Sequence, residues 1–200
     1  ASLEQQEQTR VAAVTNGGLV VTSSDAFYAS AGNLVTVGDG RDMSDGWETK
    51  RRRGPGHDWA VLALAATGVV EHVEIDTTNF KGNHPDRCAI DVACVDVAPP
   101  AGDSDDGWTE VLAPAPLQPH FRHRFRVADA GAATHLRLRI LPDGGVARLR
   151  AFGRVTDEGW LAFSAPRVPR LVPMTNLVTP NVPAFLDWPV GFVHPCVRPF

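Results

Sequence analysis

Short runs in which apolar and polar residues alternate recur along residues 19–155, and they are separated by glycine, proline and aspartate. One run, residues 135–141, places Leu136, Leu138 and Ile140 on one face of a strand and arginines on the other, outward face. Successive side chains of a strand point to opposite faces, so this pattern is typical of half-buried strands. Many such strands at short spacing predict an antiparallel β-sandwich or barrel.

Further runs predict the remaining strands and little helix. The run 58–64 fits a buried strand or a helical segment by pattern alone, but its length and bounding glycines favour a strand that ends at Thr67-Gly68. In the next strand, Glu71 is the one misfit on an otherwise apolar face. A short helical turn is expected within residues 27–34. The predicted strands cover residues 19–21, 58–64, 69–76, 89–97, 108–112, 121–127, 135–141 and 146–155.

Polarity, strand pattern and proline content together divide the chain into three parts. Residues 1–13 are polar and resemble a linker, and residues 14–155 hold the strand pattern. Residues 156–200 form a C-terminal extension that carries eight of the sixteen prolines, all from Pro166 onward. Proline lacks a backbone donor, so regular strand or helix is not expected over residues 166–200. The extension also holds many large apolar residues, so it either wraps the sandwich or contacts another chain.

Charge and hydropathy exclude two classes of partner. A formal net charge of −4 argues against a nucleic-acid binder, which usually carries a basic excess. The locally basic run Lys50–Arg53 is expected to be a solvated turn or strand end. No stretch approaches the roughly 18 apolar residues of a membrane span, so no membrane partner is expected. Neither terminus shows a targeting signal, and the expected location is the cytoplasm.

The three cysteines, Cys88, Cys94 and Cys196, show no metal-ligand spacing. Reduced thiols are the expected state.

Five blocks of polar and glycine residues occur in a fixed order over residues 14–155. Each block alone is a weak signal, whereas the ordered set is specific. The blocks are Gly17-Gly18 with Ser24-Asp25, the arginine-flanked Asp45-Gly46-Trp47-Glu48, Gly56-His57-Asp58-Trp59, Asp76-Thr77 through Phe80-Lys81-Gly82-Asn83-His84-Pro85, and Pro142-Asp143-Gly144-Gly145 with Arg148.

This ordered set resembles the allantoicase family. The resemblance implies an all-β, antiparallel jelly-roll sandwich of the galactose-binding-like type over residues 14–155. It also implies a hydrolase that releases urea from allantoate and leaves ureidoglycolate, a step in purine and ureide degradation. Family members are built from two related repeats. This chain has room for one, and the block Phe80–Pro85 is more similar to the second repeat.

Allantoate carries one carboxylate, which arginine can bind with both arms of its planar guanidinium. Through the family blocks, Arg51, Arg53 and Arg148 are the candidates for this role, with surface ion pairs as the alternative. Lys81 and Asn83 lie in a glycine-containing loop, where binding residues are common, although Asn83 could equally stabilise the loop.

Proton transfer needs a group that can act as general acid or base. The candidates are Asp45, Glu48, His57 and Asp76. His57 could instead be a plain turn residue, and Asp76 could accept a backbone hydrogen bond in an Asx turn. Trp47 is expected in the core rather than at the substrate.

No metal ligands are assigned, and a divalent metal such as manganese stays open as an optional cofactor. The apolar extension and exposed strand edges make a homo-oligomer an open expectation. Two alternatives to an enzyme remain: a sugar-binding module of the same fold, and a truncated, non-catalytic partner protein.

Overall fold

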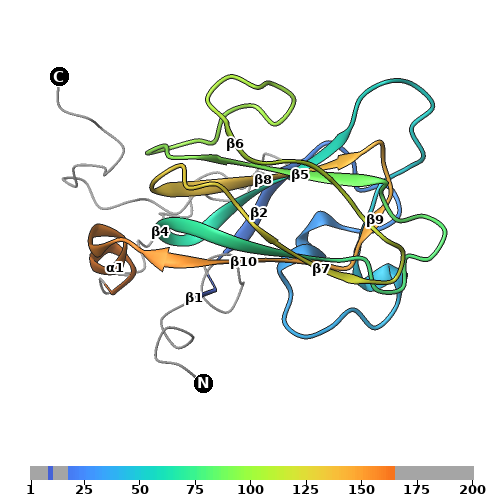
Figure 1. The fold of residues 1–200 in the computed structure, drawn as a ribbon, viewed down its shortest axis with the longest axis horizontal. Coiled ribbons are helices and arrows are strands. Elements are labelled where there is room, and N and C mark those ends of the chain that lie inside the picture. Colours follow the sequence, from blue (N-terminus) through green and yellow to red (C-terminus); the bar gives the residue numbers. More distant parts are fainter. Residues whose placement is uncertain (1–8, 11–17, 165–200) are drawn as a thin grey trace, which may run out of the picture.

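A computed structural model describes residues 9–10 and 18–164 of the chain. Eight antiparallel strands form one hydrogen-bonded sheet that folds into two layers (Figure 1). The first layer holds β2 (Leu19–Ser23), the start of β4 (Asp58–Asp76), β8 (Ala133–Leu141), β5 (Arg87–Ala93) and β6 (Thr109–Pro116). The second holds β1 (Thr9–Arg10), β10 (Arg148–Val155), the end of β4 and β7 (Arg122–Arg126). The predicted all-β sandwich is confirmed.

Strand β4 belongs to both layers because it turns back on itself. Its first residue, Asp58, pairs with Ile140 of β8, and its last, Asp76, pairs with Arg148 of β10. Gly68 lies at the opposite end of the sandwich, where it pairs with Ala133 of β8 in the first layer and with Val155 of β10 in the second. A Cβ at Gly68 would come within 2.6 Å of the Arg154 carbonyl oxygen, so glycine permits the close approach. The strand end expected at Thr67-Gly68 is therefore a bend within one continuous strand.

This bend defines two ends of the sandwich. The β8–β10 end is where β8 leads through the turn at Pro142–Gly144 into β9 (Gly145–Val146) and β10. The α1 end lies opposite, where the single described α-helix, α1 (Asp157–Ser164), follows β10 (Figure 1). The Thr156 amide donates to the Thr67 carbonyl oxygen there, at 3.0 Å.

The core lies between the layers, and the predicted inward residues Leu136, Leu138 and Ile140 are fully buried in it. Glu71 sits at a bulge, because the register of β4 with β10 skips that residue. The bulge changes which residues face inward beyond it, so Val70 is 5% exposed, contrary to the face predicted from strict alternation.

Two short 3₁₀ helices and a two-stranded pair complete the β8–β10 end. The helical turn expected within residues 27–34 is present as η3 (Ala31–Val35), slightly later than predicted. A second, η4 (Met43–Asp45), leads into β3 (Trp47–Glu48), and β3 pairs with β9.

The cysteine expectation is wrong for one residue. Cys94 is disulfide-bonded, whereas Cys88 is free and buried. Burial raises the pKa of the Cys88 thiol to about 12, so this side chain behaves as a core residue.

The predicted linker, residues 1–13, and the predicted C-terminal extension, residues 156–200, lie largely outside the described residues. Only β1 and residues 156–164 of these two segments are described. No helix among the described residues is long and apolar enough to cross a membrane.

Candidate functional site

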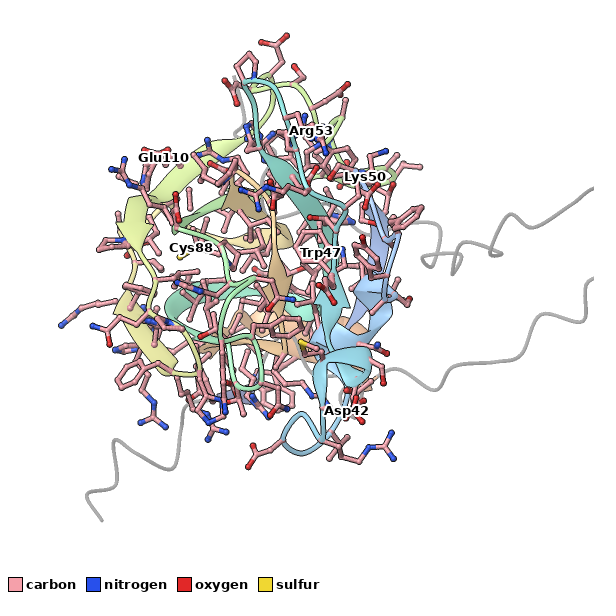
Figure 2. The ribbon with its side chains drawn as sticks, turned by 90° about the vertical axis from the view of Figure 1, so that its right-hand side faces the viewer. Asp42, Trp47, Lys50, Arg53, Cys88 and Glu110 are labelled. Carbon is pink, nitrogen blue, oxygen red and sulfur yellow. The ribbon has the colours of Figure 1, made fainter. Side chains whose placement is uncertain are left out.

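The candidate residues from four of the family blocks lie at the β8–β10 end of the sandwich, which faces the viewer in Figure 2. The pair of β3 with β9 sets Trp47 opposite Val146 and Glu48 opposite Gly145. Trp47 is fully buried, as expected, and its indole N–H donates to the Asp25 carbonyl oxygen at 2.8 Å. The buried indole fixes β3, so the neighbouring Glu48 side chain is presented on the other face of the strand.

Glu48 and Asn83 form a half-buried polar pair at this end. The Asn83 side-chain amide donates to Glu48 Oε1 at 2.6 Å, and both residues are half-buried. The backbone holds Asn83 in place, because its carbonyl oxygen accepts from the Gly145 amide at 2.8 Å. One oxygen of Glu48 is thus oriented by Asn83, while Oε2 has no hydrogen-bond partner among the described residues. A carboxylate held in this way can accept a proton from a water molecule or a ligand.

Arg148 is buried and fully engaged. Its side chain is 2% exposed and lies 2.9 Å from Asp45 Oδ2. The remaining N–H groups donate to backbone carbonyl oxygens of Asp45, Ala147, Gly38 and Asp39. A guanidinium has five N–H donors, and all five are used here. In this arrangement Arg148 ties the loop 38–45 to β10 and has no donor left for a substrate carboxylate.

Asp45 carries a stabilised negative charge. The hydrogen bond from the Arg41 backbone amide is the largest cause that lowers the pKa of Asp45, and the Arg148 guanidinium lowers it further against the opposing effect of burial. A carboxylate that is held ionised is a weak general acid, so the geometry favours a positioning role for Asp45.

Asp76 is fully buried at the end of β4. Its Oδ1 accepts from the Thr78 amide at 2.8 Å, which is the Asx-turn arrangement considered as its alternative role. Its Oδ2 accepts from Arg122 at 3.2 Å. Both carboxylate oxygens therefore have structural partners.

The basic candidates Arg51, Arg53 and Lys81 are exposed. None of the three forms a hydrogen bond or ion pair within the described part of the chain, so each is available to an anionic ligand. The sequence did not single out Arg52, which lies between them. Arg52 pairs with Asp58 at 2.6 Å, and its backbone amide donates to Asp143 Oδ2 at 2.8 Å, so it anchors this loop.

His57 lies near charged groups of the outer face of the first layer, Arg139, Arg137 and Asp105, and near Arg52. Burial, and then the charges of Arg139 and Arg137, lower the pKa of His57. This histidine is therefore neutral near pH 7 and could act as a base only toward a group at that face.

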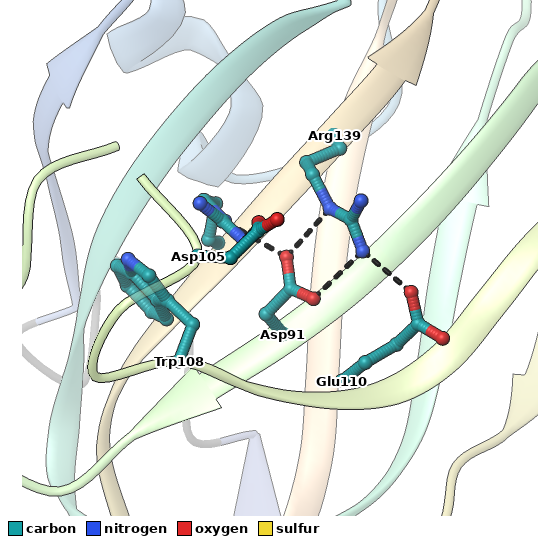
Figure 3. Close-up of a pocket in the computed structure, with 6 residues that line it drawn as sticks. Asp91, Asp105, Trp108, Glu110 and Arg139 are labelled. Carbon is teal, nitrogen blue, oxygen red and sulfur yellow. Dashed lines mark hydrogen bonds and ion pairs between the residues drawn. The ribbon is translucent and has the colours of Figure 1, made fainter. Parts of the chain in front are cut away.

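The outer face of the first layer carries a charged hollow of about 200 Å³ that the sequence analysis missed (Figure 3). Asp91 accepts from Arg137 at 2.8 Å and from Arg139 at 2.7 Å, and Arg139 also donates to Glu110 at 2.7 Å. Arg137 was expected to face outward, but it is 1% exposed because the loop that contains Gly102 and Ser104 covers it. Arg137 also lies over the Trp108 ring, 5.0 Å from its centroid. These ion pairs and hydrogen bonds give the cluster a structural role, since Arg137 links the loop that contains Gly102 and Ser104 to the sheet.

No metal ligand set is formed by the described residues: no three His, Cys, Asp or Glu side chains among them lie close enough together to hold an ion.

The family model described as "Allantoicase repeat" matches residues 9–156. A second model, "EmbC C-terminal domain", matches residues 127–200, which is less than half of the chain and includes residues outside the described part.

Several relatives and solved structures are similar to this chain. A probable allantoicase of Burkholderia mallei is 46% identical over 72% of this chain and 44% of its own length, and an allantoicase of Dictyostelium discoideum is 47% identical over 72% and 40%. The crystal structure of allantoicase from Saccharomyces cerevisiae matches with a TM-score of 0.65 and 34% identity, over 73% of this chain and 43% of that one.

A carbohydrate-binding module from a Clostridium perfringens glycoside hydrolase matches with a TM-score of 0.56 and 13% identity, over 77% of this chain and 99% of that one. At that identity the likeness concerns the jelly-roll fold alone. The chain spans less than half the length of the curated relatives it matches.

Proposed function

The chain belongs to the allantoicase family, and from this premise we propose that its jelly roll serves the hydrolysis of allantoate to ureidoglycolate and urea. The observation that carries the proposal is the Glu48–Asn83 pair, which joins two of the family blocks, 35 residues apart, at 2.6 Å.

The reaction breaks the bond between the central carbon of allantoate and one ureido nitrogen. The oxygen of water ends on that carbon, and the departing nitrogen takes a proton and leaves as urea. Glu48 is the group we assign to proton transfer, because it is half-buried, Asn83 orients its Oε1, and its Oε2 has no hydrogen-bond partner among the described residues. The hydrogen bond from the Asn83 side chain, whose backbone is held by the Gly145 amide, also limits the rotation of Glu48.

The substrate carboxylate is assigned to the exposed cations at this end, Arg51, Arg53 and Lys81. Within the described part of the chain these three form no hydrogen bond or ion pair, whereas the donors of Arg148 are all engaged. Asp45, Asp76 and Arg148 are assigned to holding the loops that carry the site. His57 lies outside this assignment, because the charges with the largest effect on its pKa, Arg139 and Arg137, belong to the outer face of the first layer.

A non-catalytic role as a binding or partner module is the second candidate. It is favoured by one observation, namely that this chain spans only 40–48% of its curated relatives. For either candidate function, we propose the cytoplasm as the location of the protein.

Urea release from allantoate by the purified chain tests the two candidates. Parallel assays with and without manganese ask whether a metal contributes. Turnover in either condition supports the hydrolase. The absence of turnover from protein that is folded by circular dichroism contradicts activity of this chain alone and favours the partner role.

A further inference from the structure

Strand β7 lies at the margin of the second layer. It pairs with β4 on one side and with no other strand among the described residues. The Thr77 amide of the β4 side donates to the Phe121 carbonyl oxygen at 2.9 Å. Backbone groups of successive residues in a strand point to opposite sides, so those of Arg122, Arg124 and Arg126 point away from β4. We refer to this side of the strand as the β7 edge.

The same three arginines form a row on the surface of β7. Arg122, Arg124 and Arg126 are exposed and share one face of the strand, whereas His123 between them is buried. The strand rise separates successive arginines by about 7 Å. β7 contains no acidic residue, although the whole chain has a net charge of −4. The β7 edge thus combines backbone groups that no described strand pairs with side chains of a single charge sign.

Much of the hydrogen-bonding capacity of these arginines is unused within the described part of the chain. Arg124 is 78% exposed and donates there through Nε alone, to Glu74 at 3.0 Å. Arg126 forms no hydrogen bond or ion pair with any described residue. Arg122 is more engaged, because it pairs with the buried Asp76 at 3.2 Å. The buried acids of β4 therefore hold two of the arginines from one side and leave guanidinium donors for a ligand.

Strand β6, at the margin of the first layer, differs from β7 in its donors. It pairs with β5 alone and carries Pro114 and Pro116, which have no N–H group. Proline on an edge strand hinders the addition of a further strand. β7 contains no proline, so its edge keeps the full set of backbone donors and acceptors.

The charge of β7 decides which further strand fits beside it. Opposite charges that face each other on paired strands stabilise the pair, whereas like charges destabilise it. β4 follows this rule on its side of β7, where Glu74 lies opposite Arg124 and Asp76 lies opposite Arg122. A second β7 would place arginine beside arginine or histidine, so the charge disfavours pairing with a copy of this strand. A segment with Glu or Asp at every second position is complementary to the edge.

We propose that the β7 edge binds an extended acidic segment of a partner protein, with Glu or Asp at alternate positions, which adds as a strand beside β7. Main-chain hydrogen bonds to Arg122, Arg124 and Arg126 supply affinity, and the arginine side chains select the acidic sequence. The proposal goes beyond the hydrolysis of allantoate and does not rest on it, since it uses none of the side chains assigned to substrate binding or proton transfer.

The test is fluorescence anisotropy of the purified chain with a labelled peptide in which Glu and Thr alternate over about seven residues, enough to span β7. The chain is expected to bind this peptide, and to bind a Lys–Thr peptide of the same length at least about tenfold more weakly. The double variant Arg124→Gln with Arg126→Gln should weaken binding of the Glu–Thr peptide at least about fivefold. Both side chains are exposed, so the variant should stay folded, which circular dichroism checks.

The matched control is Arg41→Gln with Arg87→Gln, which removes the same charge elsewhere. Arg41 is 84% exposed, and Arg87 is an exposed residue of β5, a strand that is paired on both sides. The control should bind the Glu–Thr peptide as the wild type does.

A second peptide separates strand addition from simple attraction of charges. It has the same sequence but carries N-methyl groups on the Glu amides, which cannot then donate to β7. This peptide is expected to bind at least about tenfold more weakly. The unmethylated peptide should also slow hydrogen exchange of the Arg122, Arg124 and Arg126 amides, measured by NMR.

The proposal is overturned if the folded chain does not bind the Glu–Thr peptide, because the arginines would then serve only to keep other strands away. Equal losses in the double variant and in the control overturn it as well. Equal affinity for the N-methylated peptide, or unchanged exchange of the three arginine amides, also contradicts it, since β7 would then attract anions without pairing its backbone.

Discussion

The Arg148 guanidinium lies 2.9 Å from the Asp45 carboxylate and joins the first residue of β10 to the last residue of η4. These residues are 103 positions apart in the chain. The pair therefore holds the loop 38–45 against the sandwich and positions β3, which carries Glu48.

Replacing Arg148 should destabilise the protein strongly. Arg148→Met leaves the Asp45 carboxylate without its buried partner, and the free energy of unfolding should fall by about 3–5 kcal/mol. Arg41→Met is the matched control, because Arg41 meets the same carboxylate at 3.3 Å but is 84% exposed. Its effect should stay below about 1 kcal/mol. Equal losses in urea denaturation would contradict the structural role of Arg148.

The charged cluster on the outer face gives a second stability prediction. Asp91 is 2% exposed and accepts from both Arg137 and Arg139. Asp91→Asn should lower the free energy of unfolding by about 3–5 kcal/mol, since two partly or fully buried guanidinium groups lose their shared carboxylate. Asp105 meets Arg137 at 3.2 Å but is 91% exposed, so Asp105→Asn should cost less than about 1 kcal/mol. Thermal unfolding of the two variants distinguishes these values, and a larger loss for Asp105→Asn would refute the assignment.

Gly145 lies too close to the Phe80 ring to leave room for a Cβ. A Cβ there would approach the Phe80 ring to 1.9 Å, in a fully buried contact. Gly145→Ala should therefore destabilise the protein by about 1–3 kcal/mol. Gly82→Ala is the control, because a Cβ at Gly82 has nothing within 4 Å. Similar unfolding midpoints for both variants would show that the Phe80 contact is looser than described.

Stability should fall as pH falls below about 6.5. Burial lowers the pKa of His135 to about 4, below its ordinary value of 6.5. The native state then holds His135 neutral while the unfolded chain takes up a proton, so stability is lost progressively between pH 6.5 and about 4. His135→Gln should flatten this part of the profile when unfolding is measured across that range. An unchanged pH profile would count against His135 as a contributor.

Much of the fold is predictable from the sequence because strand periodicity is a local property. Leu136, Leu138 and Ile140 alternate strictly and are all buried. The bend at Gly68 was recognisable as a break in the pattern, but not as a turn within one strand. That depends on pairing with β8 on one side and β10 on the other, which no local pattern encodes.

The site was less predictable, because its contacts join distant segments. The family blocks pointed to Glu48 and Asn83, and the structure brings them together. The same blocks suggested Arg148 as a substrate ligand. Its five donors are instead used by loop 38–45 and its own neighbour, and only the tertiary structure shows this. Periodicity likewise placed Arg137 outward but could not show the loop that covers it.

The most direct test of the account is kcat for urea release from allantoate, measured for Glu48→Gln beside Glu110→Gln. Both changes replace a carboxylate with an amide of nearly equal size. Glu48 lies in the proposed site, whereas Glu110 pairs with Arg139 on the outer face. The account predicts that Glu48→Gln lowers kcat by about 10²–10⁴-fold and that Glu110→Gln leaves it unchanged. A Glu48→Gln variant that retains the wild-type kcat would contradict the assignment of Glu48 to proton transfer.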